Sequence, residues 1–497
     1  MGLVQNDAFK TMVISYVGIG LGYLNKGLLF ILLLSTEQIG IINLILAVGV
    51  LFAQFANFGT VFTTWKFLPY FKDETKRHHG FFPLMFLFVA IGIILFTLLC
   101  ILFRTEIQQV YESKSPEFIH YYYWILPIGI GSALFMLLES YLRSFYKNII
   151  SVISYELVLR AFITLLLLLF WAKWIDFEQL LICHSIVYLI PALILLCYLY
   201  AINELNFSFR SIQISKKFRK IIIQYAGFNY INTFGAILVQ SLDVIMIASL
   251  IGLEGTGVYA TIVFLASALL VPYRSMARIS SPLVADYWKH REMDKMKELY
   301  TKFSSVSLLI GLASFMWIWM NIEFLFSFLP ADKQAEFQPG IWVFFFLMMG
   351  RLLDMFFGLN GAIFSTSKKY RYDIVFTLIL IVGVYGLNLL FIPYWGIVGA
   401  AISTGISLVF YNVARILFVW KIFKIHPFTT NQFIVIGIGI VTIIMGEFVA
   451  DYISNLWIRT GVETGLFLIC FILPIFIFNL ETESKNFVLK FWKRLKT

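Results

Sequence analysis

Charged residues are scarce in this chain of 497 residues, because only 13% are Asp, Glu, Lys or Arg. An ordinary soluble domain has about 25%. Apolar residues fill the difference: 60% of the chain is hydrophobic, Phe alone occurs 52 times, and the mean hydropathy is +0.86. A soluble protein cannot bury this much apolar surface, so the composition predicts an all-α polytopic membrane protein.

Cysteine is also scarce. The chain has 4 cysteines, all in apolar stretches and none in a CxxC pair, so we expect small buried hydrophobic residues rather than metal ligands. No segment is long and polar enough to form a soluble domain. The first apolar stretch is too long for a signal-peptide core and lacks a small-residue cleavage site, so we expect it to be retained as a helix.

Catalytic signatures are missing as well. The sequence contains no HExxH, nucleophile elbow, P-loop or acidic metal pair, so nothing in it predicts a resident cofactor or metal. Polytopic glycan polymerases and ligases usually place their reactive site in a sizeable outer loop, whereas the longest outer loop here is 104–118. We expect a protein that is not an enzyme. A glycan polymerase or ligase and a channel remain the alternatives from other classes.

The apolar stretches predict about fourteen transmembrane helices. Their expected ranges are 11–34, 41–64, 81–103, 119–141, 149–171, 179–201, 221–250, 257–282, 303–329, 339–363, 373–392, 396–420, 431–453 and 462–479. With both termini in the cytoplasm, most of the 38 Lys and Arg residues fall in cytoplasmic segments, and the opposite orientation fails this test. The net charge of +10 therefore indicates topology and contact with anionic lipid, not nucleic acid.

The second half of the chain repeats the first at an offset of 217 residues, since 32–45 parallels 249–262. This offset pairs Lys26 with Asp243, Glu37 with Glu254, Gly40 with Gly257 and Asn57 with Arg274. Each half has six spans and begins in the cytoplasm. We therefore expect parallel repeats about an axis along the membrane normal, with a substrate site between them near mid-membrane.

This repeat gives a predicted domain organisation. It comprises an N-terminal six-helix bundle at 1–205, a cytoplasmic linker at 206–220, a C-terminal six-helix bundle at 221–425, two additional helices at 426–480 and a basic cytoplasmic tail at 481–497.

Polar residues form a stripe at helical spacing on the second and the seventh span. In lipid such a face meets other helices or a water-filled cavity, and helix–helix hydrogen bonding is the simpler alternative. The candidates for contact with a polar substrate are Asn25, Gln54, Asn57, Asn229, Asn232 and Gln240.

Six cations lie inside the predicted spans: Lys26, Arg160, Arg274, Arg278, Arg351 and Arg415. The clearest acids there are Glu156, Asp243 and Asp354. Each charge facing lipid costs about 3 kcal/mol, so these groups line an aqueous cavity or are paired. Arg351 with Asp354, and Arg160 with Glu156, are close enough in sequence to neutralise each other. We expect Arg415, near the cytoplasmic end, to snorkel.

Surplus cations favour an anionic substrate, and guanidinium groups match phosphate through paired, charge-assisted hydrogen bonds. We expect Lys26, Arg274 and Arg351 to contact a pyrophosphate, with Arg160 next. The Asn and Gln stripes would meet sugar hydroxyls. Asp243, Asp354 and Glu156 would balance charge or couple an ion. Asp243 is also a candidate partner for Lys26, so contact of Lys26 with the substrate and simple pairing with Asp243 are both open.

The stretch 238–304 resembles oligosaccharide flippases of the MATE-like (multidrug/oligosaccharidyl-lipid/polysaccharide) exporter superfamily. It has an aspartate, Asp243, followed by a Gly-x-Tyr, then a proline and a short cytoplasmic helix. The stretches 32–45 and 393–404 are similar to that family too. The resemblance implies two bundles in a V shape that alternate between inward and outward openings.

The resemblance also implies a function. Superfamily members flip undecaprenyl-pyrophosphate-linked oligosaccharides or lipid II, or export drugs coupled to Na⁺ or H⁺. The drug-exporter branch typically has an acidic residue in the first helix, where this chain has Lys26, so a glycolipid flippase is favoured over a cation-coupled multidrug exporter. The two extra helices resemble the lipid II branch. The implied setting is a bacterial inner membrane, with membrane lipids, a lipid-linked glycan and other glycan-assembly membrane proteins as partners.

Overall fold

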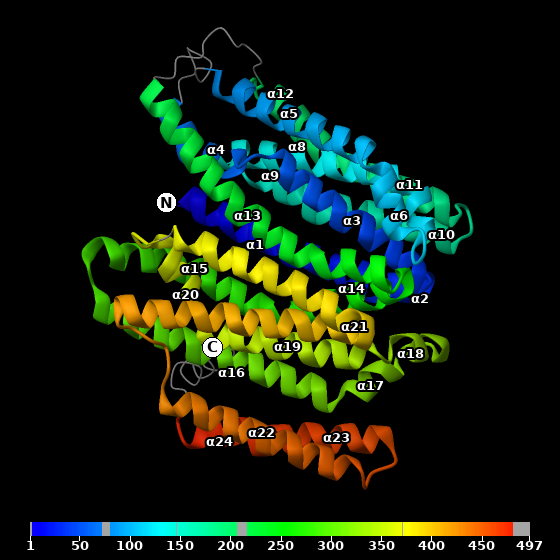
Figure 1. The fold of residues 1–497 in the computed structure, drawn as a ribbon. Helices are drawn as coiled ribbons and strands as arrows, with labels where there is room; N and C mark the ends of the chain where they lie inside the picture. Colours follow the sequence, from blue (N-terminus) through cyan, green and yellow to red (C-terminus); the bar gives the residue numbers. More distant parts are fainter. Residues whose placement is uncertain (1, 72–79, 146, 206–215, 370, 481–497) are drawn as a thin grey trace. The chain divides into compact units, whose positions relative to one another are not determined.

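The computed structural model describes residues 2–71, 80–145, 147–205, 216–369 and 371–480. Their regular structure is helical throughout (Figure 1). Thirteen helical segments in this described part are long and apolar enough to cross a membrane. One of them, α21 (Tyr372–Phe423), joins two helices across the non-helical Gly396, so the prediction of an all-α protein with about fourteen spans is confirmed.

Long apolar stretches form helices because hydrocarbon offers no partner for backbone polar groups, which must then bond within the segment. Three helices begin at a capping box, in which an N-cap side chain and a glutamine three residues later satisfy free backbone N–H groups. These helices are α3 (Thr36–Ala56), α11 (Phe177–Val187) and α22 (Thr430–Ala450).

The chain forms two compact units, Met1–Thr261 and Ile262–Thr497. The first consists of α1 (Gly2–Gly22), η1 (Tyr23–Leu29), α2 (Phe30–Leu33), α3, α4 (Thr60–Phe71), α5 (Phe81–Leu102), α6 (Arg104–Tyr111), α7 (Pro116–His120), η3 (Tyr122–Trp124), α8 (Ile125–Ser144), α9 (Ile149–Val152), η4 (Ile153–Val158), α10 (Leu159–Trp171), α11, α12 (Leu189–Ala201), α13 (Lys216–Leu250) and the start of α14 (Leu253–Ser267). The predicted division at 206–220 stays a prediction, because 206–215 lies outside the described residues, as does the tail 481–497.

Helix α8 is the centre of the first unit, because it packs against α3, α4, α5, α11 and α12. Its apolar side is fully buried, including Leu137, Leu138 and Leu142. Helix α13 lies along α3 and α4. Two hydrogen bonds fix the far end of α13: Tyr111 donates to the Ile245 carbonyl at 3.3 Å, and Ser115 to the Ala248 carbonyl at 2.6 Å.

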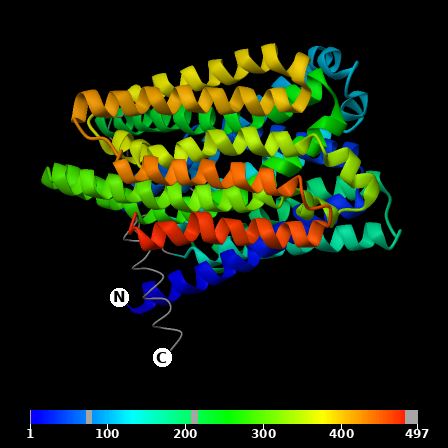
Figure 2. The same cartoon turned by 90° about the horizontal axis from the view of Figure 1, so that it is seen from below.

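The second unit begins at the end of α14 and consists of η6 (Ala268–Leu270), α15 (Val271–His290), α16 (Met293–Met320), α17 (Ile322–Ser327), α18 (Ala331–Phe337), α19 (Gly340–Phe357), α20 (Asn360–Thr366), α21, α22, α23 (Leu456–Leu466), η7 (Phe467–Ile472) and α24 (Leu473–Ile477). Helix α19 packs mainly against α21, and α16 packs against both α19 and α22. Figure 2 shows the long helices of this unit with their axes running in nearly the same direction.

The predicted span 339–363 is broken in the structure, because α19 ends at Phe357 and α20 starts at Asn360. Gly358 between them has φ +65°, in the left-handed region that favours glycine. Carbonyls at such a break need partners inside a membrane. Ser304 donates to the carbonyl of Phe356, and Tyr273 donates to that of Gly358 at 3.3 Å.

Candidate substrate-binding site

A π-helical turn, η1, carries the two polar residues of the first span. Asn25 is buried: its amide nitrogen donates to the Arg160 carbonyl at 2.9 Å, and its Oδ1 accepts from Thr164 at 2.7 Å. Lys26 Nζ donates to Asn43 Oδ1 at 3.2 Å. Wide turns of this kind occur often at functional sites, and here the turn aims successive residues at α10 and at α3.

Arg160 reaches the same segment from α10, just after a second π-helical turn, η4. Its guanidinium forms an ion pair with Glu156 at 2.6 Å and donates to the Gly18 carbonyl. A Cβ on Gly22 would lie 2.6 Å from Arg160 Nη1. The pairing of Arg160 with Glu156 is therefore confirmed, and the glycine face of α1 is the space into which this pair fits.

Two cations thus lie on adjoining elements inside the first unit, since the residue before Lys26, Asn25, donates to the Arg160 carbonyl. The ring of His184 contacts those of Phe30, one turn after Lys26, and Tyr188, at centroid distances of 6.4 and 5.5 Å. His184 is buried, and Nε2 finds no hydrogen-bond partner among the described residues. Sequence reasoning did not connect His184 with Lys26, because the two lie on helices far apart in the chain.

Gln54 and Asn57 of the polar stripe on the second span lie in different surroundings. Gln54 is buried on α3. Asn57 lies at the break between α3 and α4, where its amide nitrogen donates to the Ala53 carbonyl at 2.7 Å and its Oδ1 accepts from Thr60 at 3.3 Å. Asn57 therefore satisfies the backbone of its own helix end, and the same amide nitrogen also donates to Met136 Sδ on α8 at 3.5 Å.

The stripe of the seventh span lies on α13. Asn229 donates to the Tyr225 carbonyl one turn back, at 2.8 Å, and Gln240 is exposed. Asn232 is half-buried, and its Oδ1 has no hydrogen-bond partner within the described ranges. Asp243 is buried and accepts a hydrogen bond of 2.5 Å from Tyr259 on α14. Tyr259 is the tyrosine of the Gly-x-Tyr pattern, so this part of the resemblance has a structural role.

Arg274 on α15 and Arg351 and Asp354 on α19 belong to the second unit. In the described part of the chain no ion pair joins Arg351 to Asp354 within 4.0 Å. That these side chains meet the same ligand as Lys26 stays a prediction.

The expectation that Arg415 snorkels was wrong. Its side chain is only 9% exposed, and it forms an ion pair with Asp373 at 2.7 Å and donates to Tyr411 at 2.6 Å. The sequence hid this pair because Asp373 and Arg415 lie at opposite ends of α21. The bend at Gly396 folds the two halves of that segment back on each other.

No protein-family model matches the chain. An uncharacterized membrane protein of Methanocaldococcus jannaschii is 26% identical over 303 residues, 58% of this chain. The match spans 57% of that relative's length.

Solved structures show the fold. The lipid II flippase MurJ in an inward closed conformation is similar over 97% of this chain and 100% of its own, with a TM-score of 0.72 and 14% identity. An inward-facing multidrug resistance transporter of the MATE family, in the MOP superfamily, covers 80% of this chain and 93% of its own, with a TM-score of 0.63 and 14% identity.

A third similar structure is a MOP superfamily transporter from Pyrococcus furiosus whose binding pocket has reverse polarity. Its TM-score is 0.56 at 13% identity. It covers 84% of this chain and 95% of its own. The expected resemblance to MATE-like exporters is confirmed at the level of the fold.

Proposed function

We propose that this protein, which has the fold of MATE-like exporters, is a transporter that flips a lipid-linked glycan. The substrate would be an oligosaccharide or polysaccharide precursor on an undecaprenyl-pyrophosphate-type anchor. It would move from the cytoplasmic to the outer leaflet by alternating access. The likeness to MurJ supports this choice of branch, because it extends over 97% of the chain and so includes the additional C-terminal helices.

One observation carries the proposal: Lys26 and Arg160 lie on adjoining elements inside the first unit, where Asn25, the neighbour of Lys26, donates to the Arg160 carbonyl at 2.9 Å. In a low-dielectric interior, each of two like charges raises the free energy needed to keep the other ionised. A phosphate group placed between or beside them would relieve that repulsion and gain charge-assisted hydrogen bonds. Glu156 offsets one of the two charges, which leaves the group of three with a net charge of +1 for an anionic substrate.

The remaining roles follow from the same arrangement. Arg274 and Arg351 would supply the second unit's cations, and Gln54, Asn229, Asn232 and Gln240 would meet sugar hydroxyls. Asp243, held by Tyr259, and Asp354 are the acids available to couple Na⁺ or H⁺. The proposed setting is a bacterial cytoplasmic membrane with both chain termini inside, where other glycan-assembly membrane proteins would supply the substrate.

The test is a flipping assay with the purified full chain in vesicles that contain a fluorescent oligosaccharide on an isoprenyl pyrophosphate. Lys26→Ala and Arg274→Ala should each slow the appearance of the glycan in the opposite leaflet by at least about tenfold, as expected for a lost charge-assisted contact. Arg219→Ala on α13 removes an exposed positive charge outside the site and is the matched control.

Unchanged flipping in both variants would reject the site. Efflux of cationic dyes driven by a Na⁺ or H⁺ gradient, with no flipping of the glycolipid, would instead favour a multidrug exporter. Formation of new glycosidic bonds in the vesicles would favour a glycan polymerase or ligase.

A further inference from the structure

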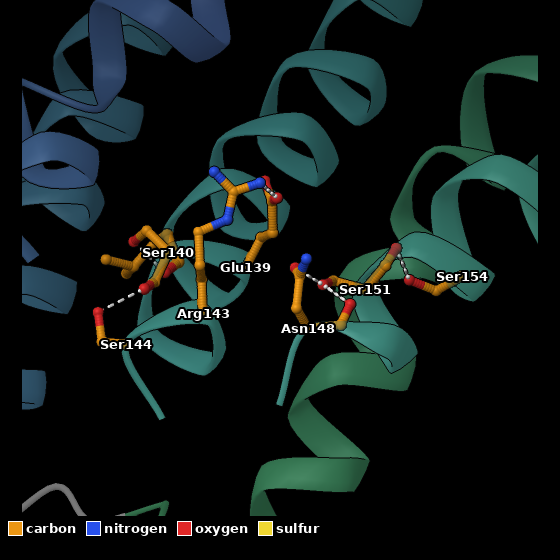
Figure 3. A network of polar contacts seen from close by, with 8 residues as sticks. Glu139, Ser140, Arg143, Ser144, Asn148, Ser151 and Ser154 are labelled. Atoms are coloured by element: carbon orange, nitrogen blue, oxygen red, sulfur yellow. Dashed lines mark hydrogen bonds and ion pairs between the residues drawn. The ribbon is translucent and has the colours of Figure 1, made fainter. Parts of the chain in front are cut away.

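The predicted cytoplasmic end of α8 carries an arginine that is held from two sides. Arg143 Nη2 donates to Glu139 at 2.9 Å, and its guanidinium lies over the ring of Trp65 on α4, 4.5 Å from the ring centroid (Figure 3 shows the Arg143–Glu139 pair). Phe62 meets Trp65 edge-on at a centroid distance of 5.2 Å, which fixes the indole in turn. A stacked and paired guanidinium is pre-organised, so it loses little freedom on binding a ligand.

This arginine is accessible, and most of its donors are available. Its side chain is 44% exposed and that of Glu139 is 25% exposed. A guanidinium has five N–H groups, and among the described residues Glu139 is the only hydrogen-bond acceptor that Arg143 meets. The predicted topology places this end of α8 at the cytoplasmic surface, where an exposed arginine is accessible to a charged ligand.

Other polar residues follow Arg143 in the chain. Figure 3 shows Asn148 just before α9, where its Oδ1 accepts from Ser151 at 3.2 Å. Its amide nitrogen makes no hydrogen bond within the described part of the chain. Trp65 Nε1 is buried and likewise has no partner among the described residues. Lys147, the residue before Asn148, is exposed. The exposed guanidinium of Arg143, followed four and five residues later by Lys147 and Asn148, suits an oxyanion with several acceptor oxygens.

Helix α8 is connected to the interior site. Tyr155 on η4 stacks on Phe135 of α8, at a centroid distance of 4.9 Å. Tyr155 directly precedes Glu156, which forms the ion pair with Arg160. In the predicted spans Arg143 lies at the cytoplasmic end, whereas Arg160 and Lys26 lie nearer the middle. Each of the two arginines carries a carboxylate one turn before it.

We propose that Arg143, held by Glu139 and Trp65, forms a phosphate-binding subsite that receives the pyrophosphate of an isoprenoid-linked substrate before Arg160 and Lys26 do. This inference rests on the proposed function. The partial neutralisation by Glu139 keeps the subsite weak, so that the substrate can leave it for the interior. A phospholipid headgroup presents the same phosphate chemistry, so the test separates the two sources.

The experiment measures binding of farnesyl pyrophosphate to the full chain in phosphatidylcholine nanodiscs by isothermal titration calorimetry. Arg143→Ala should weaken binding about tenfold. The affinity of Arg143→Lys should lie between those of Arg143→Ala and the unmodified protein, because lysine keeps the charge but cannot donate the two parallel hydrogen bonds of a guanidinium. Trp65→Leu should weaken binding less than Arg143→Ala does. Arg219→Ala, which removes an exposed positive charge on α13, should leave the affinity unchanged.

Lys26→Ala separates this inference from the proposed function. If Lys26→Ala weakens binding while Arg143→Ala does not, the subsite is rejected and the proposed function stands. If neither variant weakens binding, both are rejected. A second measurement compares thermal stability in nanodiscs with and without phosphatidylglycerol. If Arg143→Ala loses the stabilisation by phosphatidylglycerol yet binds farnesyl pyrophosphate normally, the bound group is a phospholipid and the proposal is overturned.

Discussion

Gly40 and Gly257 make reciprocal close contacts within the first unit. A Cβ on Gly40 would lie 2.0 Å from the Leu253 carbonyl oxygen, and a Cβ on Gly257 would lie 1.9 Å from the Thr36 carbonyl oxygen. The same 217 residues separate Thr36 from Leu253 and Gly40 from Gly257. The starts of α3 and α14 therefore meet as equivalent partners about a local twofold relation, which supports the repeat predicted from the sequence.

The first prediction concerns this contact. Gly40→Ala and Gly257→Ala should each destabilise the protein by about 1–3 kcal/mol, because the added methyl group displaces backbone rather than a flexible side chain. Denaturant or thermal unfolding of the purified protein measures the effect. Gly20→Ala on α1 is the matched control: nothing lies within 4 Å of its Cβ position, so the change should be neutral or stabilising. Equal stability of all three variants would contradict the prediction, because it would show that the contact between α3 and α14 accommodates the added methyl groups without loss of stability.

A second prediction tests the space beside Arg160. Gly22→Ala places a methyl group 2.6 Å from Arg160 Nη1 and should push the guanidinium off the Gly18 carbonyl. Fold and stability should change little, because the far end of a long side chain can move. Binding of farnesyl pyrophosphate should change severalfold in Gly22→Ala and not in Gly20→Ala. The same affinity in both variants would mean that the position of Arg160 does not affect the substrate.

The third prediction concerns Asp243 and Tyr259. Tyr259→Phe removes the donor of a buried hydrogen bond and leaves the carboxyl group without it, at a cost of about 1–3 kcal/mol. If Asp243 couples an ion, the variant should also shift the Na⁺ or pH dependence of transport in vesicles. Tyr225→Phe on α13, whose ring lies under Lys66, is a matched control that should leave this dependence in place. A loss of stability with unchanged ion dependence would assign Asp243 a structural role alone.

The fourth prediction concerns the ion pair of Asp373 and Arg415 in the second unit. Asp373→Asn removes the ion-pair partner of a buried guanidinium and should destabilise the protein by about 3–5 kcal/mol. The double variant Asp373→Leu with Arg415→Met should be clearly more stable than Asp373→Asn, because it removes both charges. Unfolding in detergent measures both. If the double variant is no more stable than Asp373→Asn, the two side chains stabilise the protein through packing or hydrogen bonds as well as through mutual neutralisation.

The fold was predictable because hydrophobic length and the distribution of basic residues report the membrane directly. The repeat was visible at Gly40 and Gly257 because close backbone contact tolerates only glycine there. The break at Gly396 falls at the predicted boundary between the spans 373–392 and 396–420, whereas the break at Gly358 lies inside a predicted span, since an isolated glycine in an apolar stretch does not distinguish a broken helix from a continuous one.

The site was harder to predict. Spacing along one helix correctly suggested the pair of Glu156 and Arg160, because i and i+4 share a helix face. It could not suggest Asp373 for Arg415, which depends on how α21 folds back. Nor could it show that the amide of Asn57 would be used by its own helix end. Those outcomes depend on tertiary geometry that periodicity does not contain.

The π-helical turn η1 also bears on how this chain tolerates changes in length. A π-helical turn bonds i to i+5 where an α-helix bonds i to i+4, so it holds one residue more than an α-helical turn. Removing one residue between Tyr23 and Leu29 should convert the turn to α-helix without rotating the segments on either side. The same deletion in the regular part of α1 would turn every later side chain by about 100°. Length variation among homologous first helices is therefore expected at this turn, where it would also redirect Asn25 and Lys26.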